Sequence, residues 1–191
     1  MIDNWRDSKN DEELRKFDPY AHAVTTITEP HRMAHDGFMF HASGKVTGMV
    51  DANVDEFLLV TAAGNLPHIQ RMRLDLGGGD VDIQSYEGAT ASNDGTPITT
   101  FNTNRNSSNT ADMVLNSAPT LTGDGTLLHT SWAVPIGAGV GQSASGISNI
   151  EAGEEWLLKP GTKYLIRITN NSGGTIDYRW ELLWYEIGYQ H

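Results

Sequence analysis

The residues best suited to chemistry are histidines, and most of them lie early in the chain. Five of the seven occur before residue 70, and neutral imidazole is the commonest metal ligand in proteins. His31 and His35 have the four-residue spacing that places two side chains on one helix face. However, Arg32 stands where the glutamate of an H-E-x-x-H motif would be. The five early histidines are His22, His31, His35, His41 and His68.

We interpret these histidines as loop and strand residues satisfied by hydrogen bonds. A metal-binding cupin would carry two histidines one residue apart, and no H-x-H occurs in this sequence. A cupin-like metal-dependent enzyme that uses His31, His35 and His41 is kept as a third functional hypothesis. The leading interpretation assigns no metal and no cofactor.

Three aspartates, Asp75, Asp80 and Asp82, surround the run Gly77-Gly78-Gly79. Calcium prefers clustered carboxylate and carbonyl oxygens, but the spacing of an EF-hand loop is missing. The pattern is better explained by a solvated hairpin tip between two strands, Ile69–Leu76 and Val81–Tyr86.

Nucleophilic and acid–base motifs are equally weak. Residues 141–145 read GQSAS, which lacks the last glycine of a G-x-S-x-G elbow. Glu154 with Glu155, and Glu181 with Glu186, could be imagined as glycosidase acid pairs, but any acidic β-domain offers such pairs. The sequence therefore predicts no catalytic residue and favours a protein that is not an enzyme.

Aromatic residues are a further candidate for binding, because rings can stack on sugars or fill a core. Their alternating spacing in the C-terminal part favours a core or a subunit interface over a carbohydrate site. The set comprises Trp132, Trp156, Trp180, Trp184, Tyr164, Tyr178, Tyr185 and Tyr189.

Two alternating apolar runs near the C-terminus indicate the fold that positions these rings. Tyr164, Ile166 and Ile168 fall on one face of the first run, and a second set extends from Ile176 to Trp184 with the same period. Period-two alternation is typical of half-buried strands. The turn residues 170–174, NNSGG, supply the positive φ of a tight loop. We therefore predict that the two runs form a β-hairpin with an aromatic core.

The rest of the chain suggests short strands with long polar connections. Residues 88–153 are rich in Gly, Ser, Thr and Asn, with apolar islands that predict at least two strands. The uneven spacing of the predicted strands around this long polar segment favours an all-β, jelly-roll-like β-sandwich. The predicted organisation is a short N-terminal arm over residues 1–20 and a β-sandwich domain over residues 21–191.

Composition excludes several classes of protein. The formal charge of −11 argues against direct contact with nucleic acid, which requires clustered Lys and Arg. There is no cysteine, so disulfides and thiolate sites are absent. No apolar run reaches the length of a membrane span, and the N-terminus lacks a signal peptide, so we expect synthesis in a host cytoplasm and no membrane contact.

Several blocks of the sequence resemble virion proteins of tailed bacteriophages. The group consists of cement or decoration proteins on the outside of the head. The similarity covers most of residues 20–187 and is a likeness of sequence rather than of a catalytic motif. The blocks are HRMAHDGFMFHASGK (His31–Lys45), FNTNRNSS (Phe101–Ser108), GDGTLLHTSWAVP (Gly123–Pro135) and the long stretch Glu154–Glu186.

The resemblance implies a jelly-roll homotrimer on the capsid exterior that bridges major capsid proteins. Multivalent contacts between adjacent capsomers would oppose the pressure of packed DNA, and a trimer would match a local three-fold site. The alternative is a head-fibre or carbohydrate-binding module on the virion surface.

Overall fold

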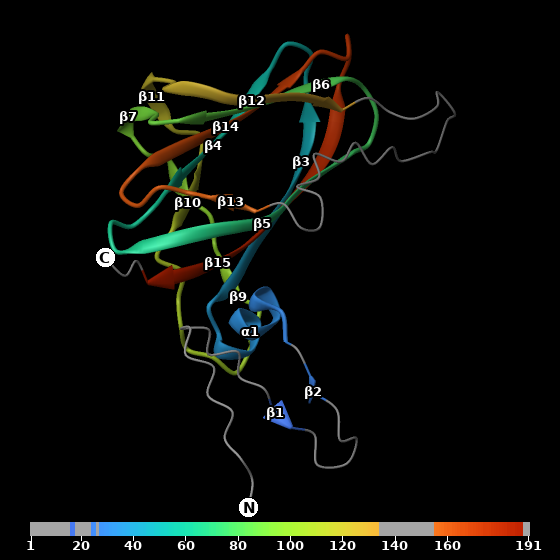
Figure 1. Ribbon diagram of the computed structural model, residues 1–191. Helices are drawn as coiled ribbons and strands as arrows, with labels where there is room; N and C mark the ends of the chain where they lie inside the picture. Colours follow the sequence, from blue (N-terminus) through green and yellow to red (C-terminus); the bar gives the residue numbers. More distant parts are fainter. Residues whose placement is uncertain (1–15, 18–23, 26, 134–154, 189–191) are drawn as a thin grey trace, which may run out of the picture.

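Two antiparallel sheets face each other and enclose the core in the computed structural model of the chain (Figure 1). The structure describes residues 16–17, 24–25, 27–133 and 155–188. The prediction of an all-β sandwich is confirmed.

The strands fall into two large and two small sheets. The six-stranded sheet has the order β12 (Thr126–Ala133), β6 (Val81–Glu87), β14 (Lys163–Asn170), β4 (Val54–Val60), β10 (Val114–Ser117), β8 (Thr96–Pro97). The five-stranded sheet has the order β13 (Trp156–Leu157), β5 (Asn65–Leu76), β15 (Ile176–Gly188), β3 (Met39–Met49), β9 (Phe101–Asn102). The small pairs are β1 (Lys16–Phe17) with β2 (Val24–Thr25), and β7 (Thr90–Asn93) with β11 (Thr120–Gly123).

The connections follow the jelly-roll plan. Strands β12, β6, β14 and β4 oppose β13, β5, β15 and β3, and the chain passes between the two sheets at nearly every step among these eight strands. Eight strands in two such four-stranded groups define a jelly roll. The inserted strands β8 and β10 extend one sheet, and β9 extends the other.

The predicted C-terminal hairpin is wrong, although both of its strands exist. β14 pairs with β4 and β6, whereas β15 pairs with β3 and β5 in the opposite sheet. The turn after β14 is therefore a crossover between sheets. The predicted turn at Gly77–Asp80 is also a crossover, because β5 and β6 lie in different sheets. In each case the apolar faces of consecutive strands face each other across the core.

These crossovers meet at one end of the sandwich around Asn170, which is fully buried. The Asn170 backbone N–H donates to the carbonyl of Asn53, and its side-chain amide donates to the carbonyls of Met49 and Gly174. Gly79 approaches so closely that an added Cβ would lie 2.4 Å from the Cβ of Ser172, and its φ of +84° suits glycine. The connection from β3 to β4, which includes Asn53, also passes between the sheets, so the three crossovers are locked together.

The core has the aromatic character that the sequence predicts. Trp184, Tyr178 and Tyr164 are buried between the sheets, and Trp180 packs on Phe57 with ring centroids 5.1 Å apart. Gly44 lies beneath the Trp180 indole, where a Cβ would come within 2.7 Å of Nε1.

A short helix that the sequence did not predict, α1 (Glu29–Asp36), covers part of the outer face of the five-stranded sheet. Pro30 occupies its first turn, and Gly37 ends it in the left-handed conformation. Met33 packs on Met39 and Tyr185, so Tyr185 is buried from outside the sandwich. Most of the predicted arm, residues 1–15 and 18–20, lies outside the described residues.

Candidate interaction surface

The structure does not assemble the histidines into one centre. His31 and His35 lie together on α1, with their Nε2 atoms 2.9 Å apart, on an exposed surface. His41 lies on β3 and stacks on Phe101 at 5.7 Å between ring centroids. Within the described residues no group of three or more His, Asp or Glu side chains is placed to hold a metal ion. His22 lies outside those residues.

His68 is the one early histidine that the described residues bury in a polar network. It stacks on Tyr185 with ring centroids 4.5 Å apart, and its Nδ1 lies 2.9 Å from Glu155. Burial tends to raise the pKa of Glu155, but hydrogen bonds from His68, Gln70 and Tyr185 outweigh it and lower the pKa. Nε2 of His68 is buried with no hydrogen-bond partner among the described residues. This cluster holds the segment before β13 against β5.

The acidic candidates serve the fold in the same way. Glu186 is buried and accepts hydrogen bonds from the backbone N–H groups of Asp112 and Met113 and from the Trp184 indole. Glu181 instead forms an ion pair with Arg71 at the surface. The two carboxylates therefore do not form an acid pair. Glu154 and residues 141–145 lie outside the described residues.

The aspartates around the triple glycine also stay apart. Asp75 pairs with Arg73, and Asp82 accepts a hydrogen bond from the side chain of Asn171. The backbone carbonyl of Asp80 accepts from the N–H of Asn171. These contacts stabilise the crossover end rather than outline an ion site.

Arg167 is the centre of an ionic cluster that joins two carboxylates from different segments of the chain. It donates two hydrogen bonds to Asp124 and one to Glu56, and its guanidinium lies over the ring of Tyr86. The hydrogen bond from Arg167 lowers the pKa of Asp124. The pKa of Glu87 is also lowered, mainly by its hydrogen bond from Lys159 and to a smaller extent by the hydrogen bond from Tyr164. Asp124 precedes β12, so this cluster anchors the start of that strand.

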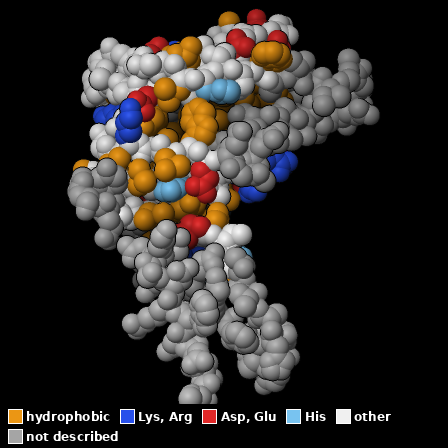
Figure 2. Space-filling view, viewed as in Figure 1, with side chains coloured by type: hydrophobic (Ala, Val, Ile, Leu, Met, Phe, Trp, Pro, Cys, Tyr) orange, Lys and Arg blue, Asp and Glu red, His pale blue; other side chains and the backbone are white. Residues whose placement is uncertain are grey.

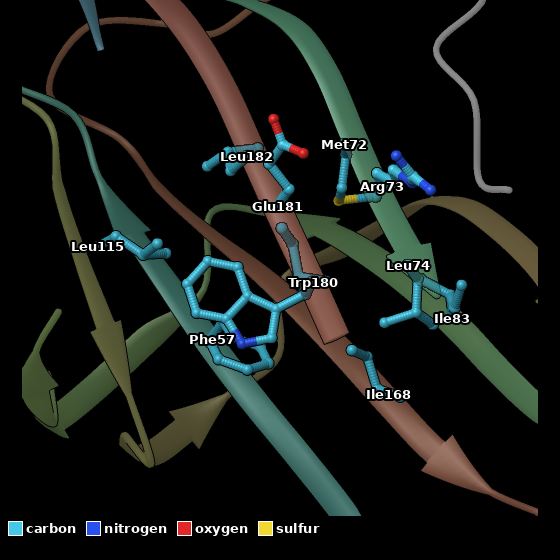
Figure 3. Close-up of a pocket in the computed structure, with 11 residues that line it drawn as sticks. Phe57, Met72, Arg73, Leu74, Ile83, Leu115, Ile168, Trp180, Glu181 and Leu182 are labelled. Carbon is cyan, nitrogen blue, oxygen red and sulfur yellow. The ribbon is translucent and has the colours of Figure 1, made fainter. Parts of the chain in front are cut away.

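The cavity between the sheets of the described residues is too small for a ligand of ordinary size. A cavity of about 30 Å³ lies between the sheets beside Trp180 and Phe57 (Figure 3). The charged ends of Arg73 and Glu181 point away from the indole in this view. Ligand pockets typically measure roughly 300–1,000 Å³, so the cavity is a packing defect of an apolar core.

Sequence reasoning missed the roles of Glu186, Asn170 and Arg167. A polar residue inside an alternating apolar run, such as Glu186 after Trp184, is the signal that could have indicated a buried clamp. Its two backbone donors, Asp112 and Met113, are 74 and 73 residues away in sequence, so they could not have been named.

The aromatic residues divide between core and surface. Trp184, Tyr178, Tyr164 and Tyr185 are buried, which excludes them from a sugar platform. Burial raises the pKa of Tyr164 to about 12. Trp132 is the exception, since 74% of its surface is exposed. Tyr189 lies outside the described residues.

Trp132 belongs to an open sheet edge formed by β12. This strand pairs with β6 on one side and has no neighbour on the other within the described residues. Leu127 and Leu128 are also about half exposed. His129 turns toward Trp156 of β13, with ring centroids 5.9 Å apart. In Figure 2, apolar side chains and histidine gather on the side where β12 and β13 run.

The other three edges of the two large sheets end in short strands that cover only part of β3 and β5, and the uncovered parts carry charged residues such as Lys45, Arg71 and Arg73. β8, β13 and β9 have two residues each, whereas β12 has eight. β12 contains no proline and no Asp, Glu, Lys or Arg. We call the free side of residues 126–133 the β12 edge. It is the surface of the described chain best suited to contact another protein.

Comparisons with known proteins assign no family. Neither a scan of the chain against protein-family models nor a search of curated proteins found a match. The similarity to phage decoration proteins therefore stays a prediction. None of the helices in the described residues has the length and apolarity needed to cross a bilayer.

Proposed function

We propose that this chain is a structural virion protein that decorates and stabilises a bacteriophage capsid by bridging major capsid proteins. Its partners would be the major capsid protein and other copies of itself, as a homotrimer on the capsid exterior. Neither nucleic acid nor membrane is a proposed partner. The resemblance of the sequence suggested this role, and the architecture of the described residues agrees with it.

The observation that carries the proposal is how the chain uses its polar side chains. Glu186, Asn170 and Arg167 each tie together segments that are distant in sequence. Their hydrogen bonds make the fold rigid. The candidate catalytic residues that the structure describes are not brought together. A rigid block of this kind suits a mechanical role, because bridging contacts resist separation only when the bridge itself does not deform.

The acidic charge also suits a position outside the head. A chain with a formal charge of −11 is repelled by packed DNA. Attachment would then rely on many modest contacts repeated over the capsid lattice, for which multivalency supplies the strength.

Heads assembled without the protein provide the test. Adding purified protein should give saturable binding and raise the temperature at which the heads release DNA. A homotrimer should appear in solution as a mass of three chains, or of a multiple of three where trimers associate further. Heads that bind no protein, or heads whose stability does not change at saturation, would contradict the proposal.

A carbohydrate-binding role on the virion surface is the second candidate, and Trp132 favours it. An exposed indole on a rigid strand can stack on a sugar ring, and the exposed Asp82 lies directly across from it on β6. A glycan screen with the wild-type chain and Trp132→Ala separates the two functions. Binding that depends on Trp132 would support the carbohydrate role, and a screen without binding would remove it.

A further inference from the structure

The β12 edge lacks most of the features that keep sheet edges from pairing. Edge strands usually carry charges or proline, or they are very short, because unpaired N–H and C=O groups recruit other strands. The edge at β8 is two residues long and contains Pro97. β12 has a bulge near Leu128, but the run His129–Ala133 pairs regularly with β6. Among the described residues, this run has no neighbour on its other side and leaves five residues of uninterrupted strand open there.

The chemistry of the edge fits a second copy of the same chain. Two molecules with a formal charge of −11 repel each other over most of their surfaces, but β12 itself carries no charge. Two acidic groups near its start form ion pairs within the chain, Asp124 with Arg167 and Glu87 with Lys159. Asp82, across from Trp132 on β6, is an exposed carboxylate beside this edge. A like-charged copy can therefore approach along the uncharged strand itself.

Ser131 supplies an independent observation. Its hydroxyl is buried and has no hydrogen-bond partner in the described part of the chain. Directly opposed serines on antiparallel strands can bond to each other. A two-fold axis through residue 131 would place Ser131 opposite Ser131 of the second copy. The same register places Trp132 opposite Thr130, and both side chains lie on the outer face of the sheet.

We propose that two copies of the chain pair antiparallel through β12, centred on Ser131, to form a continuous sheet across a two-fold axis. This contact goes beyond capsid attachment and differs from the three-fold contact of the homotrimer. A chain that makes only the β12 contact forms dimers, and one that makes both forms hexamers or larger arrays. On a head, the β12 contact would join neighbouring decoration units.

Crosslinking of purified protein tests the proposal, because the natural chain has no cysteine. Ser131→Cys should form a disulfide-linked dimer under mild oxidation, at least roughly tenfold faster than the control Ser43→Cys. Ser43 is exposed on β3, in the other sheet. Equal crosslinking rates for the two variants, or no dimer from Ser131→Cys, would overturn the two-fold pairing.

A charge placed on the edge gives a second readout. Thr130→Lys puts two ammonium groups close to the axis and should weaken self-association by roughly tenfold or more. Thr99→Lys, at an exposed site in the loop between β8 and β9, should leave it unchanged. A wild-type chain that is monomeric, or a mass unaffected by Thr130→Lys, counts against the proposal. If the backbone amides of β12 are protected from hydrogen exchange only when heads are added, the edge binds the capsid protein instead.

Discussion

The two sides of this sandwich are closed in different ways. On the side of β3 and β4, the inserted strands β9 and β10 continue both sheets, and β8 ends one of them with two residues. On the opposite side, β12 runs for eight residues with its outer edge open within the described residues, beside the two-residue β13. Short strands cover part of the first side, where the open part of β3 carries Lys45, whereas the described residues leave the uncharged β12 open along its whole length.

The difference separates residues that stabilise the fold from residues available for assembly. The closed side is fixed by buried polar clamps such as Glu186 and Asn102, whose amide donates to the carbonyls of Gly37 and Asn109. The open side displays Leu128 and Trp132, whose exposed surfaces contribute little to the stability of one chain. Substitutions should therefore affect stability on one side and association on the other.

The largest effect is expected in the core that both sides share. Trp184 is fully buried and donates its indole N–H to Glu186. Trp184→Ala should lower the free energy of unfolding by about 3–5 kcal/mol because it leaves a large cavity. Chemical denaturation measures this change. A loss below about 1 kcal/mol would mean that the rings do not hold the sandwich together.

A smaller loss is expected from the clamp on the closed side. Glu186→Gln replaces one of the two carboxylate oxygens that together accept from three donors, and it should cost about 1–3 kcal/mol. Glu181→Gln is the matched control, since its exposed ion pair with Arg71 should contribute at most about 1 kcal/mol. Equal losses in the two variants would show that the closed side does not depend on Glu186.

Acid should weaken the carboxylate hydrogen bonds that stabilise the fold before it affects the β12 edge. The pKa values of Glu87, Asp124 and Glu155 are lowered in the folded chain. Their stabilisation is complete above the ordinary carboxyl range and is lost as pH falls through the folded values. The melting temperature should therefore decrease when the pH is lowered below about 4. Asp124→Asn should lower the melting temperature at pH 7 and reduce the further decrease of the melting temperature in acid. An unchanged acid profile would contradict the role of the Arg167 cluster.

The smallest effect on stability is expected at the open side. Trp132→Ser should change the free energy of unfolding by less than about 0.5 kcal/mol, because most of its surface is already exposed. The same variant should reduce self-association measured by sedimentation. A stability loss similar to that of Trp184→Ala would place Trp132 in the core and remove the contrast between the two sides.

The sequence predicted the strands better than their partners. The alternation from Tyr164 to Ile168 and from Ile176 to Trp184 identified β14 and β15, and their inward faces were correct. The turn NNSGG specifies a reversal of the chain, but it does not say whether the strands then lie side by side or face each other. That choice depends on β3–β6, which are distant in sequence.

The polar clamps were beyond prediction for a related reason. Glu186 was recognised only as one of many carboxylates. Its backbone donors, Asp112 and Met113, lie in a loop whose position the sequence pattern did not predict. The β12 edge was visible only as two apolar islands around Leu127 and Trp132. Their position on a sheet edge follows from the jelly-roll strand order and not from local sequence.

Attachment to capsids tests the assembly role most directly. Heads lacking the protein should be titrated with the purified chain, and the bound copies per major capsid protein should be counted. The account predicts saturation at a fixed ratio, together with heads that withstand higher temperature. Binding that never saturates, or no binding at any concentration, would contradict it.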